Sequence, residues 1–60
     1  MKLNKAGQEE ARRRADGILK YAKDPKHAAY LAAVHALGGR NQREWRITDL
    51  VQEIVEREAK

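Results

Sequence analysis

The stretch His35–Thr48, HALGGRNQREWRIT, decides how the chain folds, because one apolar segment ends in it and another begins. The pair Gly38–Gly39 predicts the end of a helix, since glycine adopts the left-handed conformation of a helix C-cap without steric cost. The stretch also contains the only Trp of the chain, Trp45, together with three arginines. How these side chains are presented depends on where the next helix starts.

Two positions for that helix start fit the sequence. Asn41 and Glu44 have the spacing of a capping box, with Asn in place of the usual Ser or Thr. This start, which we favour, leaves a turn of about three residues, as in a helix-turn-helix. Thr48, followed by Asp49 in the first turn, would instead cap a shorter helix after a loop of about ten residues.

The same choice determines which way Trp45 faces. If the helix starts at Asn41, a rotation of about 100° per residue places Trp45 roughly opposite Ile47 and Val51, on the outward side. If it starts at Thr48, the preceding residues can be extended and Trp45 can fold inward, which is the more usual position of a Trp. In both cases an apolar stripe predicts a helix near the C-terminus, formed by Ile47, Leu50, Val51, Ile54 and Val55.

A first helix is predicted from about residue 5 to about residue 23, because small and apolar residues recur there at steps of three and four. These residues are Ala11, Ala15, Ile18, Leu19 and Ala22. Acid–base pairs at four-residue spacing, such as Glu10 with Arg14 and Asp16 with Lys20, support the helix. Gly17 falls on the outward side, where it marks a bend, a close contact with a partner, or a break at Asp16–Gly17.

A second helix is predicted after Asp24, which can cap it, with Pro25 in the first helical position. From Ala28 to Leu37 every residue except His35 is apolar or aromatic. A helix that is apolar all round is typically buried, so we expect this helix to lie at the centre of an all-α, three-helix domain.

The length of 60 residues bounds the architecture to one domain, residues 1–60. A chain of this size buries only roughly 60% of the surface that its unfolded form exposes. Because the chain has no Cys, neither disulfides nor thiolate zinc sites can compensate for this small buried surface. We therefore expect a homodimer or another homo-oligomer. The initial Met and the solvated C-terminus suggest a complete small protein.

Composition excludes several classes of function. No apolar run approaches the ~18 residues of a membrane span, and the N-terminus is too charged for a signal peptide, so we expect a cytoplasmic protein with no membrane partner. Ser and Cys are absent, and His27 and His35 lie eight residues apart, too distant to share a metal ion. Because no phosphate-binding loop matches either, we expect no enzyme activity, cofactor, metal or small-molecule substrate.

The net charge of +4 points to an acidic partner. Arg, Asn and Gln are the side chains that bind base edges and phosphates, so the favoured interpretation is a regulatory DNA-binding protein that uses the turn and the start of the third helix. The alternative is an inhibitor or adaptor that docks on an acidic protein surface through Trp45 and its neighbouring arginines. The candidate binding residues are Arg40, Asn41, Gln42, Arg43, Trp45 and Arg46, extended by Lys23 and Lys26 near the start of the second helix.

Overall fold

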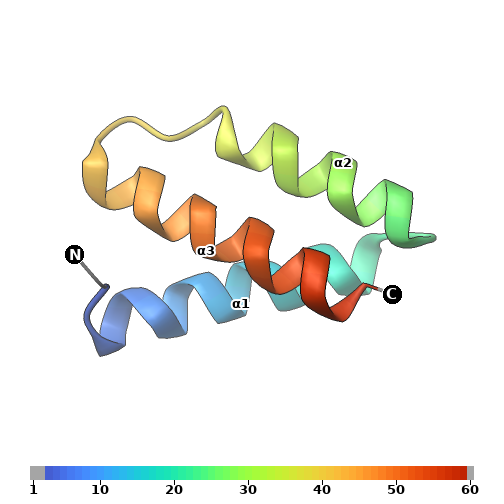
Figure 1. The fold of residues 1–60 in the computed structure, drawn as a ribbon, viewed down its shortest axis with the longest axis horizontal. Helices are drawn as coiled ribbons and strands as arrows, with labels where there is room; N and C mark the ends of the chain where they lie inside the picture. The colour runs from blue at the N-terminus through green and yellow to red at the C-terminus, as the bar shows by residue number, and fades with distance from the viewer. Residues whose placement is uncertain (1–2, 60) are drawn as a thin grey trace.

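Three helices make up the fold in a computed structural model that describes residues 3–59. They are α1 (Lys5–Tyr21), α2 (Pro25–Ala36) and α3 (Gln42–Glu58), which confirms the predicted all-α class. Consecutive helices run in opposite directions and lie side by side in a compact bundle of 31 × 20 × 15 Å (Figure 1).

Helix α1 begins where a side chain satisfies its first free N–H groups. The Asn4 Oδ1 accepts a hydrogen bond from the Gly7 N–H at 2.8 Å. The helix continues through Gly17, so the break at Asp16–Gly17, which was one alternative from the sequence, does not occur. It ends at Tyr21 rather than at residue 23, because Ala22 is extended and the chain turns back towards the cap of α2.

Helix α2 starts as the sequence predicts. The Asp24 Oδ1 accepts a hydrogen bond from the His27 N–H at 2.7 Å, and Pro25 occupies the first helical position. The predicted left-handed glycine at its other end is wrong, since no described glycine has a positive φ. The helix instead ends in a tighter turn, in which backbone N–H groups donate hydrogen bonds to the carbonyls three residues earlier. One example is the bond from the Gly39 N–H to the Ala36 carbonyl at 3.3 Å.

Helix α3 starts early, as favoured from the sequence. The Asn41 Oδ1 accepts a hydrogen bond from the Glu44 N–H at 2.9 Å. Three residues separate Asn41 from Leu37, the C-cap of α2. Thr48 lies inside the helix, is 3% exposed, and donates its hydroxyl hydrogen bond to the Trp45 carbonyl at 3.0 Å. Thr48 is therefore a buried residue of α3 and not its cap.

The central helix of the bundle is α3, so the prediction of a central α2 is wrong. Helix α3 packs against both other helices, which contact each other much less. Its apolar stripe supplies the largest fully buried side chains, Ile47, Val51 and Val55, whereas α2 buries only Ala28 and Ala32. Helix α2 thus turns alanines towards the core, whereas its larger residues Tyr30 and Val34 are exposed.

The resulting core is thin. Half of its buried apolar residues are alanines, which are Ala11 and Ala15 of α1 and Ala28 and Ala32 of α2. Because the stabilisation from burial scales with the apolar area removed from water, alanines contribute little of it. All the buried branched residues of this core come from α3, and partly buried Ile18, Leu19 and Leu50 pack against it.

Candidate binding surfaces

The first candidate surface, which we name the basic turn, comprises residues 40–46 between α2 and the first turn of α3. Arg40, Asn41, Gln42, Arg43 and Trp45 are exposed there, and Arg46 is partly buried. Arg40 and Arg43 form no salt bridge with any residue from 3 to 59. The structure thus brings six of the predicted site residues together at one end of the molecule (Figure 1).

The acidic residue within the basic turn is already engaged by another helix. Arg14 donates from Nη1 to the Glu44 Oε2 at 3.0 Å and from Nη2 to Oε1 at 3.3 Å, which is a bidentate pair. Arg14 also donates from Nε to the Glu10 Oε2 at 3.0 Å. Hydrogen bonding from Arg14 holds the pKa of Glu44 below its usual range. Glu44 therefore ties α1 to the start of α3 and offers little free negative charge to a partner.

Trp45 is held in place while half of its surface stays open. Its indole Nε1 donates a hydrogen bond to the Gly39 carbonyl at 3.1 Å, and the side chain is 52% exposed. The ring covers Gly39 so closely that a Cβ there would lie 2.5 Å from the Trp45 Cδ1. The absence of a side chain at Gly39 thus allows the contact, and the ring presents a fixed apolar surface to solvent.

Lys23 and Lys26 do not join the basic turn. They lie at the connection between α1 and α2, whereas Arg40 follows the other end of α2 (Figure 1). Twelve helical residues separate the two connections, a rise of about 18 Å. The structure therefore divides the predicted site into two basic regions at opposite ends of the bundle.

Beyond its first turn, α3 is poorly shaped to enter a DNA groove. Ile47 and Thr48 are buried against the other helices, and the exposed side continues with acidic Asp49 and Glu53. Helices α2 and α3 also run antiparallel beside each other, whereas a helix-turn-helix crosses at about 90–120° (Figure 1). The side-chain oxygen of Asn41 accepts the helix-cap hydrogen bond, so Asn41 can offer a base chiefly its side-chain NH2 donor.

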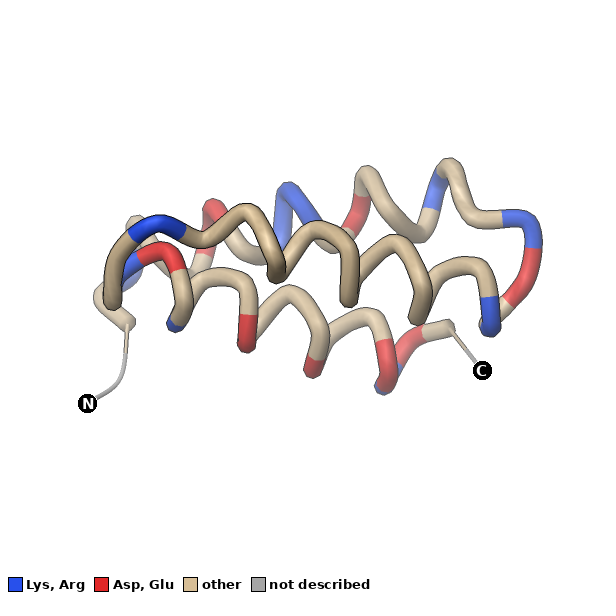
Figure 2. The backbone as a smooth tube through the Cα atoms, turned by 90° about the horizontal axis from the view of Figure 1, so that it is seen from above, with Lys and Arg blue, Asp and Glu red and all other residues tan. Residues whose placement is uncertain are grey.

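The second candidate surface is one that sequence reasoning missed, because it assigned α2 to the interior. Tyr30, Val34 and Leu37 are 64%, 46% and 85% exposed on the outer side of α2. A signal for it existed in the spacing of Tyr30, Ala33, Val34 and Leu37, which is that of an apolar helix stripe. No Asp, Glu, Lys or Arg occurs from residue 27 to residue 39. Figure 2 shows this as an uncharged run between charged positions at the two ends of α2.

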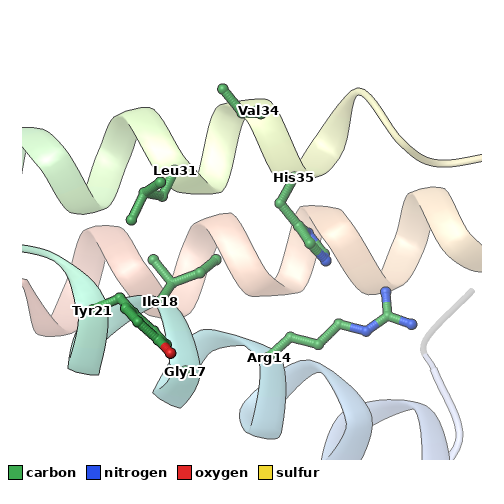
Figure 3. A pocket seen from close by; sticks show the side chains of 7 residues that line it. All are labelled: Arg14, Gly17, Ile18, Tyr21, Leu31, Val34 and His35. Carbon is green, nitrogen blue, oxygen red and sulfur yellow. The ribbon is translucent and has the colours of Figure 1, made fainter.

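An open groove between α1 and α2 continues this surface. Its volume is about 470 Å³, and Ile18 of α1 and Leu31 of α2 point towards each other across it (Figure 3). Together we name the groove and the outer stripe the α1–α2 face. Its apolar part consists of Gly17, Ile18 and Tyr21 from α1, Tyr30, Leu31 and Val34 from α2, and Leu37 at the C-cap of α2, and the polar residues Arg14 and His35 also line the groove.

The two histidines do not form a site together. The His27 Nδ1 accepts a hydrogen bond from the Lys23 N–H at 3.1 Å, next to the cap of α2. His35 lines the groove near Arg14, and its buried Nδ1 has no hydrogen-bond partner among the described residues (Figure 3). Within residues 3–59, no three His, Asp or Glu side chains gather as metal ligands.

Comparisons with known proteins give no relative for this chain. No protein family, no curated protein and no solved structure matches it significantly. The described helices also include none that is long and apolar enough to cross a membrane.

Proposed function

We propose that this chain is a small binding protein that docks on an acidic surface of a larger protein through the basic turn. The observation that carries the proposal is the fixed, half-exposed ring of Trp45 beside Arg40 and Arg43. Trp and Arg are the residue types that dominate the energetics of protein interfaces. An aromatic ring that is already held in one position loses little conformational freedom when a partner covers it.

The charges of the basic turn favour an acidic partner. Arg40 and Arg43 have no salt bridge within the described chain, so a partner carboxylate does not compete with an internal one. Glu44, the acidic residue of the turn, is paired with Arg14. Arg can bind a carboxylate through two parallel hydrogen bonds, which adds geometric specificity to the attraction.

A capture experiment with matched variants tests this proposal. The immobilised chain is exposed to nuclease-treated host lysate, and retained proteins are identified by mass spectrometry. We expect a protein that is retained by the wild type and by Lys20→Glu, which reverses an exposed charge on α1, but lost with Trp45→Ala and with Arg43→Glu. Equal retention of every protein by all four chains would contradict docking through the basic turn.

Nucleic acid is the second candidate, and one observation favours it. Arg40 and Arg43 flank the N-terminus of α3, where free N–H groups and the helix dipole favour a phosphate. Contact through two arginines neutralises about two phosphates, so raising salt from about 50 mM to about 200 mM should weaken duplex DNA binding about tenfold. Fluorescence anisotropy with labelled duplex measures this. No binding at the lower salt concentration, or binding that is independent of salt, removes DNA from consideration.

A further inference from the structure

The α1–α2 face has the composition of a buried helix interface although it lies on the surface. Tyr21 and Leu37 are 82% and 85% exposed, although both carry large side chains that are mainly apolar. Monomeric proteins rarely expose contiguous apolar patches of this kind without a binding role. The question is which molecule covers the face.

Gly17 indicates that a close-packed backbone covers it. Glycine is disfavoured in a helix interior relative to alanine, yet Gly17 sits within α1 at the edge of the groove. A Cβ added at Gly17 would meet nothing within 4 Å in the single chain. The single chain therefore gives no steric reason for glycine there, whereas a helix packed into the groove would.

The face offers both a ridge and a groove. Tyr30, Val34 and Leu37 form an exposed ridge along α2 and its C-cap, and Val34 also lines the groove together with Gly17, where an added Cβ would meet nothing within 4 Å. A twofold axis would place the ridge of each copy in the groove of the other, since an isologous interface uses the same patch twice. The ridge contains no charged side chain, and Arg14, which lines the groove, is paired with Glu10 and Glu44, so two chains of net charge +4 can approach there without burying unpaired like charges.

We propose that two copies of this chain associate through the α1–α2 face. The thin core of the single chain is the second reason for this partner, because dimerisation would bury the bulky side chains that the core lacks. A stable interface covers about 800 Å² per partner, which is roughly one sixth of the 4666 Å² that the chain exposes. The dimer leaves the basic turn outside the face, so it does not depend on the proposed docking function.

Salt separates this dimer from binding through the basic turn. Two copies of charge +4 repel each other, and salt screens that repulsion, so dimerisation should strengthen as salt rises. Docking on an acidic protein or on DNA should weaken under the same change. The two proposals can therefore fail independently.

Sedimentation and light scattering test the dimer from about 10 µM to about 1 mM protein, the range in which weak association changes the mass. We expect the mass to rise from 6.9 kDa towards twice that value. Val34→Lys should raise the dimer dissociation constant at least about tenfold, because it buries an unpaired charge. The matched control is Gln8→Lys, which adds the same charge on the opposite side of α1 from Gly17.

A second variant tests the packing at Gly17. In the monomeric Val34→Lys background, Gly17→Ala should raise the melting temperature, since the new methyl group meets open space. In the wild-type background the same change should weaken dimerisation several-fold, because the methyl group occupies the space of the partner helix. A mass of one chain at every concentration, a dimer that Val34→Lys does not weaken, or a dimer that dissociates as salt rises would overturn the proposal. Circular dichroism confirms that each variant is folded.

Discussion

Helices α2 and α3 are both rich in apolar residues, but they use them in different ways. Helix α3 has one narrow stripe, and that stripe supplies the fully buried Ile47, Val51 and Val55. Helix α2 is apolar at every position from Ala28 to Val34, yet it buries only two alanines, while Tyr30 and the C-cap residue Leu37 stay exposed. The helix with more apolar residues is therefore not the central one here. The central helix is the one whose apolar residues form a single stripe with polar residues on the opposite side.

The sharpest test of this comparison exchanges one large apolar side chain in each helix for alanine. Ile47→Ala should lower the free energy of unfolding by about 2–5 kcal/mol, because it leaves a cavity in the thin core. Leu37→Ala should change it by no more than about 0.5 kcal/mol in dilute solution, since the side chain is exposed. Urea denaturation measures both values. Similar losses for the two variants would contradict a central α3.

A second comparison concerns the two glycines that join α2 to α3. Gly39→Ala should destabilise the fold by about 1–3 kcal/mol, because the new Cβ would displace the Trp45 ring. Gly38→Ala should cost much less, since its Cβ would lie at an ordinary 3.5 Å from the His35 carbonyl oxygen. Trp45 fluorescence should shift to longer wavelength and become more quenchable by iodide only in Gly39→Ala. An unchanged spectrum would mean that Gly39 is not what holds the ring.

The helix caps allow a third test. Asn41→Ala should lower the free energy of unfolding by about 1 kcal/mol, because it removes the hydrogen bond to the Glu44 N–H. Asn41→Ser retains an oxygen at the cap and should restore most of the loss. Thermal unfolding followed by circular dichroism measures the series. If both variants had the same stability as the wild type, α3 would not depend on this cap.

The smallest expected effect is a dependence of stability on pH through Glu44. Its pKa is lower in the folded chain, chiefly because Arg14 donates a hydrogen bond to it. Its contribution to stability is therefore complete above the usual Glu pKa of about 4.3 and declines as the pH falls through the lower folded pKa. Glu44→Gln should reduce the stability loss between about pH 5 and about pH 3.

The control for Glu44→Gln is Glu53→Gln, which removes a carboxylate whose salt bridge among residues 3–59 is to Arg57 of the same helix. Acid titrations of both variants, followed by urea denaturation at each pH, separate the link between helices from a local pair. A Glu44→Gln chain with the full wild-type loss in acid would show that the Arg14 contact does not persist in solution.

The sequence allowed correct prediction of the features that depend on neighbours along the chain. Asp24 and Asn41 cap the helices that they were expected to cap, and Trp45 faces outward, because these depend on spacings of a few residues. The side of α2 that is buried was not predictable, since an apolar side chain occurs at almost every angle around it. The buried side is determined by packing against the neighbouring helix, because two helices can approach more closely where alanine lies between them than where tyrosine does.

The contacts between helices around the candidate site could not be predicted from the sequence either. Glu44 has the spacing of a capping box with Asn41, but its side chain pairs with Arg14, which lies 30 residues away. Arg12 likewise connects α1 to Glu58 near the C-terminus, at 2.6 Å. Such pairs depend on which helix faces lie opposite each other, and no pattern of local spacing encodes that arrangement.

The bond between Trp45 and Gly39 has a consequence for the kinetics of folding. It closes a loop of only six residues, and loops of that size form on a timescale of tens of nanoseconds. The ring can thus close the connection between α2 and α3 before the distant contacts of α1 are made. Helical bundles with such local contacts fold within microseconds to milliseconds. We expect the hairpin of α2 and α3 to be the first part of the chain to become ordered, with α1 joining it last.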